Sequence, residues 1–94
     1  MKYWRIKDNV SVEELTKHGF QLRGRYYMRK IDPSLLPETA RIYTNFVYIG
    51  NEQSVFPGMV SMLHHQEDPT PYIQDLITIG IVELTEIEEV STKQ

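Results

Sequence analysis

Apolar and polar residues alternate in several short stretches of this chain, which is typical of β-strands that bury one face. The clearest stretches are residues 2–7, 20–31 and 81–87. In residues 20–31 the even-numbered positions are mostly apolar and the odd-numbered positions mostly basic, so we expect the even-numbered side chains to point inward. Residues 41–49 place β-branched and aromatic residues on both faces. This pattern predicts a central strand with both faces at least partly covered.

Two other stretches show apolar residues at helical spacing and predict short helices. Residues 12–20 align without gaps on residues 73–81, and the aligned glycines are Gly19 and Gly80. A glycine at this position typically ends a helix in the left-handed conformation. In both copies a strand-like stretch follows at once. The chain therefore contains a helix–glycine–strand unit twice.

The start of each predicted helix carries its own signal. Ser11 and Glu14 form a capping box, in which the serine hydroxyl accepts a hydrogen bond from an otherwise unpaired amide. Thr70 is the predicted N-cap of the second helix, and Pro71 suits its first position because its φ angle is already helical. We therefore expect helices that begin directly after Ser11 and Thr70.

The middle of the chain is less regular. Gly50-Asn51 predicts a two-residue hairpin turn that needs positive φ angles, with a return strand at residues 52–56. The pattern in residues 59–66 favours an irregular or helical turn, but an extended segment fits it as well. The conformation of residues 57–69 therefore stays open at this point.

These elements predict a single α+β domain over residues 1–94, with residues 88–94 as a frayed tail. We expect a small, mainly antiparallel sheet of four to five strands with two short helices packed on one face. The six tyrosines, three phenylalanines and one tryptophan favour an ordered, strand-rich domain over a disordered chain.

Composition narrows the classes of function. The chain has no cysteine, so disulfides, thiolate metal sites and cysteine nucleophiles are excluded. No apolar run reaches the ~20 residues that span a bilayer, and the N-terminal residues do not resemble a signal peptide. We therefore expect a cytoplasmic protein without a membrane partner. No catalytic motif is found, and His64-His65 lacks the spacing of a zinc motif, so we predict no enzyme, metal or cofactor.

Charge is divided unevenly along the chain. Residues 1–31 contain eight Lys/Arg and three Asp/Glu, whereas residues 32–94 contain two Lys/Arg and ten Asp/Glu. Such a division can create a basic surface for a polyanion. It can equally mean that basic and acidic strands lie side by side in one sheet.

The odd-numbered face of residues 20–31 is the candidate binding site. It would present Arg23, Arg25, Tyr27 and Arg29 together. Arginine can bind phosphate through two parallel hydrogen bonds, and tyrosine can stack on a base. The alternative is a solvated face, or cross-strand pairing with the glutamates of residues 81–87. A second candidate is an apolar surface formed by Phe56 and the methionine-rich residues 59–63, which could equally be part of the core.

The chain also resembles a known type of small protein. Residues 4–20 and 72–84, including the sequence Tyr-Ile-Gln-Asp-Leu, are similar to stretches of small uncharacterised phage and prophage proteins of Gram-positive bacteria. The resemblance covers about a third of the chain. It implies a phage accessory context and no particular activity.

Together these observations predict a small phage-type accessory protein that binds another protein. The protein partner is unknown, and homodimers are plausible because so small a sheet exposes its strand edges. The alternative function is nucleic-acid binding through Arg23, Arg25, Tyr27 and Arg29.

Overall fold

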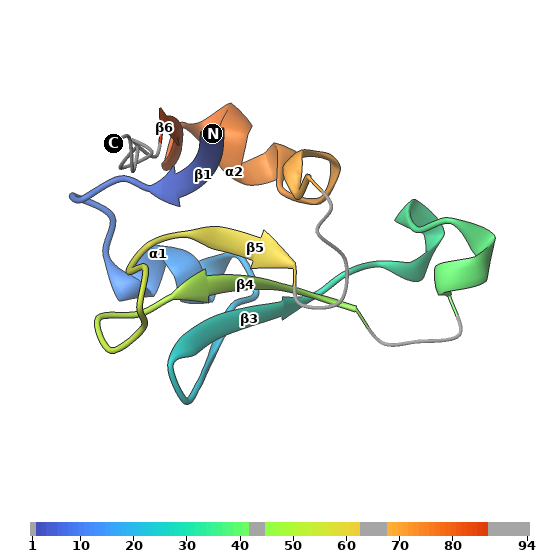
Figure 1. The fold of residues 1–94 in the computed structure, drawn as a ribbon, viewed down its shortest axis with the longest axis horizontal. Helices are drawn as coiled ribbons and strands as arrows, with labels where there is room; N and C mark the ends of the chain where they lie inside the picture. The colour runs from blue at the N-terminus through green and yellow to red at the C-terminus, as the bar shows by residue number, and fades with distance from the viewer. Residues whose placement is uncertain (1, 42–44, 63–67, 87–94) are drawn as a thin grey trace, which may run out of the picture.

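The computed structural model describes residues 2–41, 45–62 and 68–86, which contain six strands and two α-helices (Figure 1). The elements in chain order are β1 (Lys2–Ile6), α1 (Val12–Lys17), β2 (Gln21–Arg23), β3 (Tyr26–Lys30), η1 (Pro33–Leu35), η2 (Glu38–Ala40), β4 (Phe46–Gly50), β5 (Val60–Met62), η3 (Thr70–Tyr72), α2 (Gln74–Ile79) and β6 (Val82–Glu86), where η marks a 3₁₀-helix.

The strands form two antiparallel sheets, which confirms the predicted α+β class. One sheet has the order β2-β3-β4-β5, and the other is the pair β1-β6. The sequence predicted four to five strands in one sheet, but β1 and β6 pair separately. The two sheets meet where the Ile6 N–H donates to the Gly58 carbonyl at 2.9 Å and where Arg5 forms an isolated bridge with Met59.

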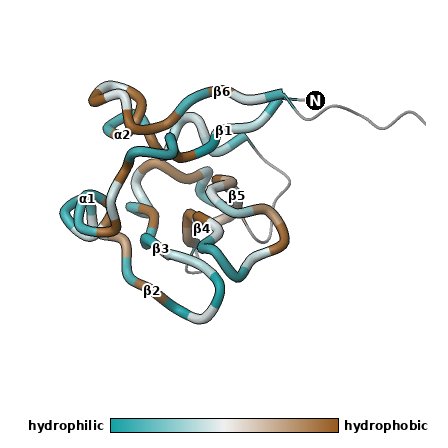
Figure 2. The backbone as a smooth tube through the Cα atoms, turned by 90° about the vertical axis from the view of Figure 1, so that its left-hand side faces the viewer, coloured by the Kyte–Doolittle hydropathy of each residue, from teal (hydrophilic) through white to brown (hydrophobic). Residues whose placement is uncertain are grey.

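The hydrophobic core lies on one side of the four-stranded sheet. Both helices and the β1-β6 pair lie on that same side (Figure 2). We call this side of the sheet the inner face and the opposite side the outer face. The buried apolar residues come from both sheets, both helices and the connections between them. They are Ile6, Leu15, Phe20, Ile31, Leu36, Val47, Ile49, Val60, Met62, Ile73, Leu76 and Val82.

The repeated helix–glycine–strand unit is present in both predicted places. Gly19 and Gly80 have φ angles of 88° and 81°, in the left-handed region that glycine adopts without strain. In the first unit the Phe20 N–H donates to the Leu15 carbonyl at 3.1 Å. In the second the Ile81 N–H donates to the Leu76 carbonyl at 3.2 Å. Equivalent residues therefore close both helices with equivalent bonds.

The two helices begin differently. The Ser11 hydroxyl accepts from the Glu14 N–H at 3.3 Å, so the serine cap of α1 is confirmed. The prediction that Thr70 caps the second helix is wrong. Thr70 begins the 3₁₀-helix η3, and its hydroxyl accepts a 2.7 Å hydrogen bond from the Trp4 indole N–H while donating to Asp68. This hydroxyl connects η3 to β1 and is therefore not available to α2.

The basic stretch 20–31 is a hairpin, not one strand. Gly24 and Arg25 form a two-residue turn between β2 and β3, with a φ of 61° at Gly24. The expected orientation holds for Phe20, which is buried, but it is wrong in β3, because Tyr27 packs against the core and Ile31 is buried, whereas Tyr26 is 41% exposed. The odd-numbered positions of β3 therefore face inward. Arg29 can join them because its charge is paired there, as described below.

The middle of the chain differs from the prediction in two places. Strand β4 begins at Phe46, and residues 42–44 of the predicted strand lie outside the described residues. Residues 52–56 form turns, and β4 pairs instead with β5, inside the stretch for which a turn was favoured. Gly50 does not have a positive φ. Glycine is needed at this position because the backbone of residue 56 lies close to it: a Cβ on residue 50 would be 2.6 Å from the Phe56 carbonyl oxygen.

The acidic C-terminal strand does not lie beside the basic hairpin. Strand β6 pairs with β1, which places Glu86 opposite Lys2 and Glu83 opposite Arg5. The interpretation that β6 neutralises the arginines of residues 20–31 is therefore wrong. The positive charges of the hairpin are therefore accommodated in other ways, which differ between the inner and outer faces of the sheet. The predicted tail at residues 88–94 lies outside the described residues.

Candidate functional site

Arg29 lies at the centre of the inner face, where it connects both helical units. Its Nη1 donates to the His18 carbonyl at 3.0 Å, at the end of α1. Nη1 and Nη2 also donate to the two carboxylate oxygens of Asp75 at 2.8 and 3.1 Å, and Nη2 donates to the Tyr72 carbonyl at 2.8 Å. The guanidinium carbon lies 4.8 Å from the centroid of the Phe20 ring. With four of its five N–H donors engaged, Arg29 fixes the fold and has little capacity left for a phosphate.

The carboxylate of Asp75 responds to this contact. Its partial burial by itself would raise its pKa, but the hydrogen bonds and positive charge of Arg29 outweigh burial and hold the pKa below its ordinary value. His18 also lies near the carboxylate, with Nδ1 at 3.7 Å from Oδ2. Asp75 is therefore an ionised partner that holds Arg29 in place.

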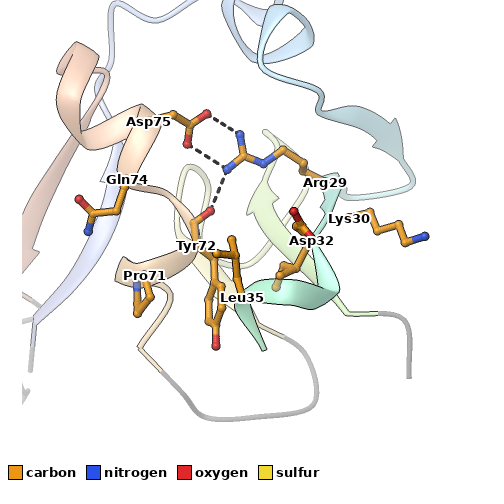
Figure 3. Close-up of a pocket in the computed structure, with 9 residues that line it drawn as sticks. Arg29, Lys30, Asp32, Leu35, Pro71, Tyr72, Gln74 and Asp75 are labelled. Carbon is orange, nitrogen blue, oxygen red and sulfur yellow. Dashed lines mark hydrogen bonds and ion pairs between the residues drawn. The ribbon is translucent and has the colours of Figure 1, made fainter. Parts of the chain in front are cut away.

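A pocket of about 400 Å³ opens beside this ion pair, between η1 and the start of α2 (Figure 3). Its apolar wall includes Leu35, Pro71 and Tyr72, and its polar wall includes Arg29 and Asp75. Arg29 reaches across to Asp75 and to the Tyr72 carbonyl, whereas Lys30 points away (Figure 3). Asp32, also in the wall, accepts from the Ser34 N–H at 2.9 Å, which lowers its pKa. Arg29, Asp32 and Asp75 thus already have hydrogen-bond partners within the protein.

The four residues predicted as one binding face are not brought together as one. Tyr27 and Arg29 point to the inner face, Arg23 lies on the outer face, and Arg25 is in the turn. Arg23 donates to the Gln21 side chain at 3.2 Å. The side chain of Arg25 has no hydrogen-bond or ion-pair partner in the part of the chain that the structure describes. Two of the four remain available on the surface.

The outer face of the sheet carries a row of three aromatic rings. Tyr26 and Tyr48 meet edge to face with centroids 5.7 Å apart, and Tyr48 and Phe46 lie 6.3 Å apart. We call Tyr26, Tyr48 and Phe46 the aromatic row. Cross-strand pairing places Arg23 opposite Tyr26 and Lys30 opposite Phe46, so one cation flanks each end. From the sequence, Tyr26 was expected to point inward, and Phe46 and Tyr48 were expected on a central strand with both faces partly covered.

A second exposed feature is the loop of residues 51–59, between β4 and β5. Val55 is 79% exposed and Phe56 is 59% exposed at its tip. We call these two residues the apolar tip. The Asn51 side chain accepts from the Gln53 N–H at 2.8 Å and donates to the Gly24 carbonyl at 2.8 Å. The loop is thus fixed against the turn of the β2-β3 hairpin.

Within residues 2–41, 45–62 and 68–86, no three His, Asp or Glu side chains are grouped so that they could hold a metal ion. His64 and His65 lie outside these residues. No helix in the described part of the chain is long and apolar enough to cross a membrane.

The chain was compared with known proteins at three levels. No model of a protein family, no curated protein and no solved structure matches it.

Proposed function

We propose that this chain is a small accessory protein that binds another protein through the apolar tip, Val55 and Phe56. The observation that carries the proposal is that two adjacent apolar side chains, one of them aromatic, are held in solvent on a hydrogen-bonded loop. The resemblance of residues 4–20 and 72–84 to small phage proteins supports an accessory role. The absence of cysteine is compatible with action in a reducing cytoplasm.

The rigidity of the loop is the reason that the apolar tip suits binding. Gly50 and residues 58–59 close the base of the loop, with the Gly58 N–H donating to the Gly50 carbonyl at 2.8 Å and the Gly50 N–H to the Met59 carbonyl at 3.1 Å. The Ser54 hydroxyl donates to the Asn51 carbonyl at 3.0 Å. A preorganised loop loses little conformational entropy on binding, so more of the contact free energy contributes to affinity.

The chemistry of the apolar tip indicates the kind of partner. Aromatic side chains that insert into pockets dominate the binding energy of many protein interfaces. The loop is bonded to the hairpin turn, where the Asn51 N–H donates to the Arg25 carbonyl at 2.9 Å. Arg25 therefore lies at the same end of the molecule. We propose a partner with an apolar pocket and an acidic group at its rim.

The test begins with a photo-crosslinking amino acid in place of Phe56, which identifies the partner in cells. The purified partner is then titrated with the wild type and with the variant Val55→Ser, Phe56→Ser. We expect the double variant to weaken binding by about tenfold or more, since truncation of a central apolar anchor typically costs over about 1 kcal/mol. Thermal unfolding should change little because both side chains are exposed.

Leu35→Ser is the matched control. Leu35 is 58% exposed, but it lines the pocket beside the Arg29–Asp75 ion pair and does not belong to the loop. Equal affinity of the double variant and the wild type would contradict the proposal. Solution mass is measured in parallel. A dimer that becomes a monomer in the double variant would identify a second copy of this chain as the partner.

A further inference from the structure

We propose that the outer face of the four-stranded sheet binds single-stranded nucleic acid, with bases stacked on the aromatic row and phosphates held by Arg23 and Lys30. This site differs from the apolar tip and does not depend on it. It also differs from the site predicted by sequence, because Arg29 and Tyr27 belong to the inner face.

The first argument is the position of the rings. A small sheet normally buries its aromatic residues on the face that the helices cover, but here both helices lie on the opposite side (Figure 2). Tyr26 lies on β3, and Tyr48 and Phe46 lie on the adjacent strand β4. The ring of Tyr48 contacts the rings of both Tyr26 and Phe46. Tyr26 is 41% exposed, and Tyr48 and Phe46 are half-buried. Stacking on accessible rings tolerates any base, because every base has an aromatic face.

The second argument is charge. The outer-face side chains on the described strands are Gln21, Arg23, Tyr26, Met28, Lys30, Phe46, Tyr48 and Ser61, as the cross-strand pairing indicates. None of these is acidic, although the whole chain has a net charge of −3. The ammonium group of Lys30 has no ion pair within the described residues. A polyanion therefore finds cations on this face without competing carboxylates.

The third argument is dimension. Tyr26 and Lys30 are four residues apart on β3, which corresponds to about 14 Å along an extended strand. Sheet platforms of this kind stack about two or three bases. A duplex keeps its bases stacked inside, so it could use only the cations. These facts favour a single strand over a duplex, and over a protein partner that would need no cation at each end of an aromatic row.

The experiment measures fluorescence anisotropy of labelled oligo-dT and oligo-U of about 12 nucleotides, at ~50 mM salt, with a duplex of equal length as reference. We expect both single strands to bind more tightly than the duplex. The preference between the two sugars will show whether DNA or RNA is the better ligand. Tyr48→Ala should weaken binding by about tenfold or more, whereas Tyr48→Phe, which keeps the ring, should retain it.

The double variant Arg23→Gln, Lys30→Gln should flatten the dependence of log Kd on log salt by about 1.4, as expected for two lost phosphate contacts. The matched control Lys2→Gln, Lys17→Gln removes the same charge away from the outer face. The apolar-tip variant Val55→Ser, Phe56→Ser should bind oligonucleotides like the wild type. This makes a failure here distinct from a failure of the protein-binding proposal.

Three results would overturn the inference. One is the absence of any anisotropy change with oligo-dT and oligo-U at ~50 mM salt, where electrostatic binding is strong. Another is equal affinity of Tyr48→Ala and the wild type. The third is a dimer in solution that Tyr48→Ala converts to a monomer, which would assign the outer face to a second copy of this chain.

Discussion

Similar side chains differ in burial and in pairing between the inner and outer faces of β3. Arg29, on the inner face, is mostly buried and bonded to Asp75 and two backbone carbonyls. Lys30, the next residue, is exposed on the outer face without an ion pair in the described part of the chain. Tyr27 packs against the core, while Tyr26 is exposed and meets the ring of Tyr48 edge to face. Residue type alone therefore does not assign a face.

The difference shows what each face is suited to do. On the inner face, Arg29 uses four of its N–H donors to connect the ends of both helical units. The outer face keeps rings and cations whose binding capacity is largely unused. Substitutions on the inner face should therefore change stability, and substitutions on the outer face should change binding.

The largest contrast is expected for neighbouring residues of β4. Ile49 is 1% exposed on the inner face, and Tyr48 lies on the outer face. Ile49→Ala should lower the free energy of unfolding by about 2–5 kcal/mol, because it leaves a cavity in the core. Tyr48→Ala should cost about 1 kcal/mol, for its ring contacts. Urea unfolding followed by circular dichroism measures both, and similar losses would show that the outer face is covered.

The second contrast concerns two arginines of the basic hairpin. Arg29→Gln should cost about 2–3 kcal/mol, because it leaves the Asp75 carboxylate and the carbonyls of His18 and Tyr72 with fewer donors. Arg23→Gln should change stability by less than about 0.5 kcal/mol, because Arg23 is exposed and bonds only a glutamine side chain. The same urea curves provide the measurement, and an equal cost would refute the distinction between the faces.

The arrangement of Arg29 explains which features the sequence could predict. The capping box and the glycine stops are local signals, and Ser11, Gly19 and Gly80 behave as expected. In β3, Arg29 can lie on the inner face because it forms an ion pair with Asp75, which is 46 residues away in the sequence. The alternation of apolar and polar residues is a local pattern and cannot predict such a distant ion-pair partner.

The same limit applies to the candidate site. The alternating pattern predicted residues 20–31 as one strand, but the turn at Gly24 and Arg25 divides this stretch into β2 and β3. Phe46 and Tyr48 join the outer face only through the pairing of β3 with β4, which is not a local property. The pairing of β1 with β6 is equally non-local and accounts for the wrong neighbour of the acidic strand.

The smallest effect is a pH dependence carried by Asp75, whose folded-state pKa is lowered. A lowered pKa stabilises the fold fully above the unfolded value of about 4 and loses that contribution as pH falls through the folded value. Asp75→Asn should therefore cost about 1 kcal/mol or less at neutral pH, since the carboxylate is half-exposed and screened, and the cost should vanish in acid. Asp32 and Asp68, whose pKa values are also lowered, remain in both proteins, so their contributions cancel in the comparison. Urea unfolding of the two proteins across this pH range isolates the Asp75 contribution, and a cost that persists in acid would show that Asp75 acts through its shape and not its charge.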